Sequence, residues 1–162
     1  MQTRYKLCLL ALVVVVTAAP GGRPHFLRAP SASLGSPKVI VDWTEVGLGN
    51  TQNGITYVAS AKAGAHFQCV KRGHVCPKPG AKEEVLKNVY VSGTFTIDKN
   101  GRISNTLTIP APESSLVCPY GQSVTLVSVV FTNITLKDTT NGLTAPANPS
   151  SLSYSTTGCP DY

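Results

Sequence analysis

The chain has 162 residues, of which 42% are hydrophobic and 14% are charged, with five cysteines and a formal net charge of +6. This length is enough for one ordinary domain. The mild positive charge suits solubility and weak attraction to anionic partners. It lacks the basic density of a nucleic-acid-binding protein, so no nucleic acid is expected as a partner.

Residues 1–18 are typical of a secretory signal peptide. Arg4 and Lys6 precede an apolar run from Leu7 to Ala18, which as a helix would be about 18 Å long, well short of a hydrocarbon core of about 30 Å. We therefore expect a secreted, extracellular protein, with an uncleaved N-terminal anchor as the alternative. Removal of Arg4 and Lys6 leaves 14 − 2 = 12 cations and 8 carboxylates, a net charge of +4.

The next segment, residues 19–37, is rich in Pro, Gly, Ser and Ala and is interpreted as a flexible leader. Residues 38–162 are then expected to form a single β-sandwich domain. The first strand of that domain is predicted at residues 39–43, where Trp43 is interpreted as a core anchor.

Alternation of apolar and polar residues predicts a long strand from Ile55 to Cys69, with the odd positions buried. A second alternating stretch covers residues 89–97. The pair Asn100-Gly101 favours a type I′ hairpin turn into a return strand over residues 103–109, which Pro110 ends.

Two more strands are predicted, at residues 123–136 and 152–155, and residues 82–87 could form a turn of helix. In the first of these strands, one face is expected to carry Val124, Leu126, Val130, Ile134 and Leu136. Many alternating strands with almost no helix predict an all-β fold, specifically an immunoglobulin-like β-sandwich.

Four cysteines remain after signal removal, and in an exported chain they predict two disulfides. Cys69 with Cys76 and Cys118 with Cys159 would close a tight loop and tie down the C-terminus. Cys69 with Cys118 and Cys76 with Cys159 would instead place one disulfide between two sheets. The second pattern is favoured slightly, because an inward-facing Cys69 points away from a surface loop.

A metal site is disfavoured for the same cysteines. His66 and Cys69 are three residues apart, so on a regular strand their side chains point to opposite faces. A zinc site of His66, Cys69, His74 and Cys76 would need both faces to meet one ion. No metal and no cofactor are therefore expected.

Cations gather around the stretch "CVKRGHVC", which predicts a basic binding loop of Lys71, Arg72, His74 and Lys78. Its expected partner is anionic: a polysaccharide, a lipid surface or an acidic protein. A solvated loop that carries charge for solubility is the plainer alternative. A protease inhibitor that presents Lys71-Arg72 on a disulfide-constrained loop is the alternative from another functional class.

Catalytic motifs are missing from the sequence, which has no Gly-x-Ser-x-Gly elbow and no phosphate-binding glycine loop. The thiols are expected to be oxidised, and the adjacent carboxylates Glu83 and Glu84 are expected in an exposed turn. We therefore expect a non-enzymatic binding domain. Asn133-Ile134-Thr135 is an N-glycosylation sequon, with Asn133 expected to point outward.

Two turn motifs, Cys118-Pro119-Tyr120-Gly121-Gln122 and Asp138-Thr139-Thr140-Asn141-Gly142, give the chain a family resemblance. Over about residues 38–145 it resembles small exported β-sandwich proteins of unassigned function from actinomycete-like bacteria. The resemblance implies export and the sandwich fold, and it implies that Cys69–Cys118 is the shared disulfide. It implies no activity.

Overall fold

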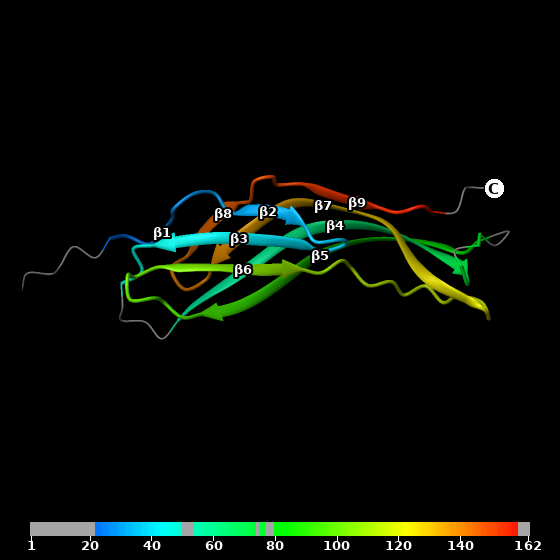
Figure 1. Cartoon of the computed structure of the whole chain (residues 1–162), viewed down its shortest axis with the longest axis horizontal. Helices are drawn as coiled ribbons and strands as arrows, with labels where there is room; N and C mark the ends of the chain where they lie inside the picture. Colours follow the sequence, from blue (N-terminus) through cyan, green and yellow to red (C-terminus); the bar gives the residue numbers. More distant parts are fainter. Residues whose placement is uncertain (1–21, 50–53, 74, 77–79, 159–162) are drawn as a thin grey trace, which may run out of the picture.

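The computed structural model describes residues 22–49, 54–73, 75–76 and 80–158, and these form an all-β structure of two sheets (Figure 1). The predicted signal peptide, residues 1–18, lies outside the described residues. In the described part of the chain, no helix is both long and apolar enough to cross a membrane.

The small sheet is built around β3 (Val39–Val46). On one side β3 pairs with β6 (Ile103–Ile109), and its other edge is shared by β1 (His25–Phe26) and β2 (Ser31–Leu34). Strands β1 and β2 lie inside the segment predicted to be a flexible leader. That prediction is wrong for His25–Phe26 and Ser31–Leu34, which pair with β3, because strands this short carry too little alternation to be recognised in a sequence.

The large sheet has the order β5 (Lys82–Phe95), β4 (Ile55–Lys71) and β7 (Gln122–Asp138). The outer edge of β7 is shared by β8 (Leu143–Pro146) and β9 (Leu152–Ser155). The long strand predicted from the alternation after Ile55 is thus confirmed as the centre of this sheet.

Two local predictions around β5 are wrong. Residues 82–87 are not helical, because they continue β5 and pair in register with β4, with Glu83 opposite Phe67. Asn100-Gly101 does lie in a turn, in which Gly101 has a φ of 69°. That turn joins no hairpin, since β5 belongs to the large sheet and β6 to the small one.

The face predicted for the 123–136 strand is wrong in its middle. The register of β7 against β4 shifts near Val127 and again near Asn133, where the backbone φ is +52°. Each extra residue moves the following side chains to the other face. Phe131 is therefore fully buried, whereas Val130 is exposed on the outer face.

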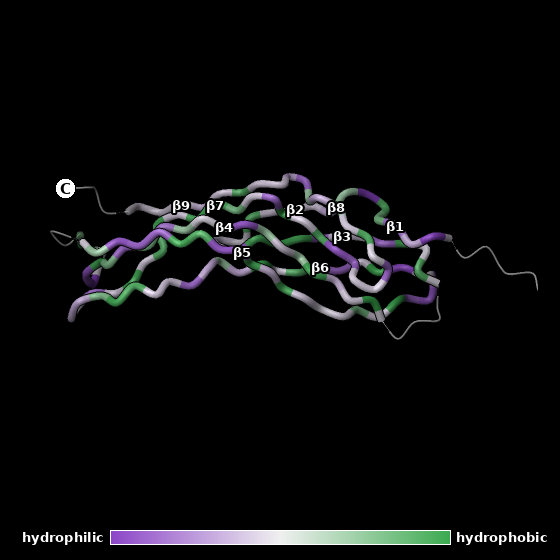
Figure 2. Tube along the Cα trace, turned by 180° about the vertical axis from the view of Figure 1, so that it is seen from behind, coloured by the Kyte–Doolittle hydropathy of each residue, from purple (hydrophilic) through white to green (hydrophobic). Residues whose placement is uncertain are grey.

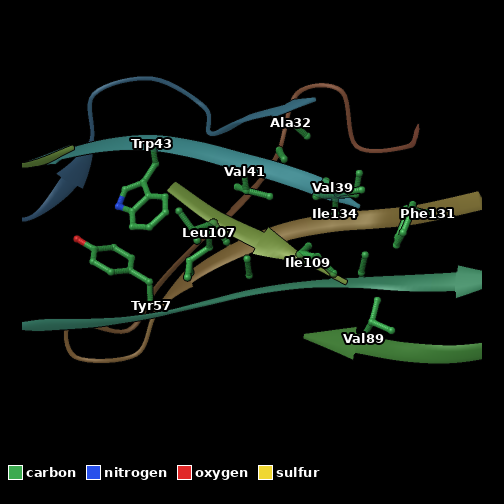
Figure 3. Packing of buried hydrophobic residues seen from close by; sticks show 14 of the residues in the cluster. Ala32, Val39, Val41, Trp43, Tyr57, Val89, Leu107, Ile109, Phe131 and Ile134 are labelled. Carbon is green, nitrogen blue, oxygen red and sulfur yellow. The ribbon is translucent and has the colours of Figure 1, made fainter. Parts of the chain in front are cut away.

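The core lies between the two sheets, and its aromatic part is at the end near β1 (Figure 3). Trp43 packs on Tyr57 with ring centroids 4.7 Å apart and on Phe95 at 5.3 Å, so its prediction as a core anchor is confirmed. Hydropathy coloured along the chain shows apolar stretches in the strands of both sheets (Figure 2).

The large sheet extends beyond the small one, at the right-hand end of Figure 1. We call this extension the arm. It consists of residues 67–71 of β4, 82–86 of β5 and 122–126 of β7, together with the connecting segment 110–121.

Candidate functional site

The arm is held by a disulfide between Cys69 and Cys118, whose Cα atoms are 5.5 Å apart. This pairing confirms the Cys69–Cys118 half of the favoured pattern, although the disulfide does not bridge the two sheets as expected. Cys118 precedes β7, which is the neighbour of β4 in the large sheet. The bond therefore fastens segment 110–121 to the inner face of the arm, where Cys69 is fully buried.

Glu83 supplies a second fastening on the same face. Its carboxylate accepts hydrogen bonds from the hydroxyls of Ser114 and Ser115 and from the backbone N–H groups of Ser115 and Leu116. These hydrogen bonds, above all those from the two serine hydroxyls, hold the pKa of Glu83 below its ordinary value. Glu83 thus lies on a strand with a structural role, and the prediction of an exposed turn is wrong.

The outer face of the arm is covered by the chain near Gly158, at the position of Gln68. Gly158 lies so close to this face that an added Cβ would meet Val127 Cγ1 at 2.6 Å and Gln68 Oε1 at 3.3 Å. Four consecutive β4 residues, Phe67 to Val70, are buried, although their side chains alternate between faces. The arm is covered on both faces in this region.

The end of the arm presents the cations of the predicted loop. Lys71 is the last residue of β4, its backbone N–H donates to Val75 O at 2.9 Å, and Arg72 and Gly73 form the exposed turn between them. Lys71 also pairs with Gln122 at the start of β7. The turn that precedes Gln122 therefore lies beside these two cations.

Exposed apolar side chains gather at the same end, which the sequence reasoning missed. Tyr120 is fully exposed, and Val117 and Val75 are 87% and 56% exposed. Tyr120 lies in a turn closed by Gln122 N–H donating to Pro119 O at 3.0 Å. We call Lys71, Arg72, Val75, Val117 and Tyr120 the basic tip.

Two of the four residues of the predicted basic binding loop, Lys71 and Arg72, thus belong to the basic tip. His74 and Lys78, which belong to the predicted binding loop, lie outside the described residues. Cys159 lies outside them too, so its predicted disulfide with Cys76 stays a prediction.

A buried polar cluster lies at the other end of the molecule. Glu45 and Tyr57 are fully buried, and within the described residues neither carboxylate oxygen of Glu45 nor the Tyr57 hydroxyl has a hydrogen-bond partner. Burial raises the pKa of Glu45 to about 7; the nearby Tyr57 hydroxyl offsets part of this rise, and the charge of Asp138 adds to it. Burial also raises the pKa of Tyr57 far above its ordinary value.

Asp138, although buried, is satisfied by its own turn. Its carboxylate accepts hydrogen bonds from the backbone N–H groups of Thr140 and Asn141 and from the Asn141 side-chain amide. The motif Asp-Thr-Thr-Asn-Gly is thus a carboxylate-capped turn between β7 and β8. Glu45, in contrast, has no such donors and is best accommodated as the neutral acid.

Two further predictions concern single side chains. Asn133 is exposed at its bulge, as expected, and its glycosylation stays a prediction. His66 lies on the outer face, with its Nδ1 atom 3.9 Å from the Glu84 carboxylate. The described residues contain no group of three or more His, Cys, Asp or Glu side chains arranged to hold a metal ion.

The chain matches no known family model, no curated protein and no solved structure.

Proposed function

We propose that the protein is a secreted, non-enzymatic interaction domain whose basic tip binds an anionic lipid surface. The observation that carries this proposal is the composition of the tip, where Lys71 and Arg72 lie beside the exposed side chains of Tyr120, Val117 and Val75. Cations attract anionic head groups, and tyrosine and aliphatic side chains gain free energy at the interface between head groups and acyl chains.

The apolar members favour lipid over the other anionic partners. A polysaccharide could bind the cations and stack on Tyr120, but it has no apolar groups that would cover the exposed side chains of Val117 and Val75. An acidic protein could use all five residues, but nothing at the tip specifies such a partner. For the protease inhibitor, the tight turn closed by Lys71 and Val75 offers little extended backbone to a protease cleft.

The rigidity of the arm supports the same proposal. A site fastened by a disulfide and by the Glu83 hydrogen bonds loses little conformational entropy when it binds. Each cation near an anionic surface contributes about 1 kcal/mol, so the binding would be weak, reversible and sensitive to salt.

The proposal also includes an immunoglobulin-like fold, export from the cell and a second disulfide. The order of the large sheet, with β4 between β5 and β7, corresponds to the G-F-C-C′ arrangement of variable-type immunoglobulin domains, which favours an immunoglobulin-like sandwich. The Cys69–Cys118 disulfide favours an oxidising compartment and hence export. A second disulfide between Cys76 and Cys159 would complete the four-cysteine pattern.

The test is flotation with vesicles of phosphatidylcholine alone and of phosphatidylcholine mixed with phosphatidylglycerol. We expect binding only to the mixed vesicles, and at least about tenfold weaker partitioning for the double variant Lys71→Gln/Arg72→Gln. The matched control is Lys99→Gln/Arg102→Gln, which removes the same charge from an exposed turn at the opposite end of the molecule.

Tyr120→Ser should weaken vesicle binding without changing the net charge. Equal loss in both double variants would show that only the overall charge matters, which contradicts a specific tip. Retention on a heparin column that depends on Lys71 and Arg72, without vesicle binding, would indicate a polysaccharide instead. Inhibition of trypsin that Arg72→Ala abolishes would support the inhibitor alternative.

A further inference from the structure

The two long sides of the sandwich are closed to different degrees. On one side, the small and large sheets are tied together through Asn148, whose N–H donates to Pro30 O at 2.8 Å and whose carbonyl accepts from Ala32 N–H at 3.1 Å. On the other side lie β5 and β6, each the edge strand of its own sheet. Strand β5 has 14 residues, far longer than the short edges that proteins usually leave open.

The backbone of β5 offers hydrogen-bonding groups along this open edge. Cys69 N–H donates to Ala81 O, so odd-numbered residues face β4 across this ladder. Because hydrogen bonding alternates along an antiparallel pair, the even-numbered residues of β5 direct their N–H and C=O groups to the free edge. From Glu84 to Thr94, no backbone hydrogen bond in the described part of the chain joins this edge to another segment.

Space is available beside the middle of this edge. A shallow groove of about 280 Å³ runs along residues 87–90 and is bounded by the segment 110–113. On the outer face of the same strand, Leu86 and Tyr90 are 71% and 72% exposed. An added strand would therefore meet open backbone groups and two large apolar side chains.

We infer that β5 pairs antiparallel with β5 of a second copy of this chain, about a two-fold axis at Asn88. In this register Leu86 of each copy lies opposite Tyr90 of the other, on the outer face, and the two exposed side chains cover each other. Glu84 lies opposite Ser92 and Lys82 opposite Thr94, so no charge meets a like charge. The strand is thus complementary to itself.

Registers with the axis shifted toward the start of β5 fit less well. An axis at Lys87 would place two lysines directly opposite each other, which is destabilising. An axis at Leu86 would pair fewer residues and would leave both Tyr90 side chains opposite Lys82. The axis at Asn88 pairs the strand from Glu84 to Ser92 in both copies and accommodates Lys87 opposite Val89.

The self-association is tested by multi-angle light scattering over a micromolar concentration range. We expect a concentration-dependent dimer, since a pair of edge strands buries less surface than a permanent interface. Asn88→Pro should abolish the dimer, because it removes an N–H that faces the free edge but is not used in the ladder with β4. Asn88→Ala, which keeps that N–H, should still dimerise. A monomer throughout the range, or a dimer that Asn88→Pro leaves intact, would overturn the inference.

Disulfide trapping tests the register and does not depend on whether the proline variant folds. Paired residues that exchange hydrogen bonds have Cα atoms about 5.5 Å apart, within the range of a disulfide. Asn88→Cys should therefore form a covalent homodimer under mild oxidation, whereas Tyr90→Cys alone should not. Leu86→Cys mixed with Tyr90→Cys should form the mixed dimer. Equal cross-linking of Asn88→Cys and Tyr90→Cys would contradict this pairing.

Discussion

The two ends of the molecule are stabilised by different means. At the end near β1, two sheets face each other and bury an aromatic cluster around Trp43 and Tyr57. In the arm, the large sheet has no opposing sheet, and a disulfide and the Glu83 carboxylate fasten a connecting segment over its inner face. Where the large sheet extends past the small one, its inner face is thus covered by a connecting segment. A disulfide and hydrogen bonds hold that segment in place, in addition to apolar packing.

The largest effect is expected from Trp43→Ala in the aromatic end. Loss of this buried side chain and the cavity left behind should lower the free energy of unfolding by about 3–5 kcal/mol. Urea denaturation measures this change. Val117→Ala, at an exposed site in the arm, is the control and should change stability by less than about 0.5 kcal/mol. Similar losses of stability in both variants would contradict the conclusion that the aromatic core stabilises this end of the molecule.

Removal of the disulfide by Cys69→Ala/Cys118→Ala should cost about 2–4 kcal/mol, because the bond closes a long loop with a sequence separation of 49 residues. The loss should be concentrated in the arm. Hydrogen exchange should therefore accelerate in residues 82–86 and 122–126, with smaller changes in β3 and β6. Uniform acceleration across both sheets would indicate that the arm does not open separately.

Glu45→Gln should stabilise the protein at alkaline pH. The folded-state pKa of Glu45 is about 7, above its ordinary value of 4.5, so between these pH values the folded state holds a proton that the unfolded state has lost. Wild-type stability should fall as the pH rises through this window and then level off. The variant lacks this loss, and at pH 8 it should be more stable by about 3 kcal/mol. Thermal melts at pH 5 and pH 8 would test the difference; an equal effect at both would exclude ionisation as its cause.

Glu83→Gln should have the smallest effect, confined to the arm. The pKa of Glu83 is lowered, so its contribution is present above its ordinary pKa and is lost as the pH falls below that value. Hydrogen exchange in residues 114–116 should therefore be faster in the variant at neutral pH, and similar to wild type in acid. The two ends of the molecule should thus respond to pH in opposite directions. Unchanged hydrogen exchange at neutral pH would show that the Glu83 hydrogen bonds do not stabilise the arm.

The sequence was a good guide wherever side chains alternate strictly. The pattern after Ile55 located β4, and the one before Pro110 located β6. It failed where backbone irregularity interrupts the period. The bulge near Val127 has no distinctive residue, and asparagine, which tolerates the positive φ of Asn133, also occurs on regular strands, so the inward face of β7 could not be followed past these bulges.

The candidate site was predictable in part. The charges of Lys71 and Arg72 are visible in the sequence, and so is the oxidised state of the cysteines. Tyr120 and Val117 are distant from them along the chain. The favoured Cys69–Cys118 disulfide was the signal that could have placed them near Lys71, and the pairing of Lys71 with Gln122 shows that they share one end of the arm. Strands β1 and β2 were missed because short edge strands carry little alternation.

The length of β4 gives the protein a defined reach. Its 17 residues, at about 3.3 Å each, span about 56 Å from Ile55 to the tip at Lys71. Gly22 lies against Gly47 at the opposite end of the molecule, near β1. The first described residue and the basic tip therefore lie at opposite ends of the molecule, and the long continuous strand β4 sets the distance between these ends.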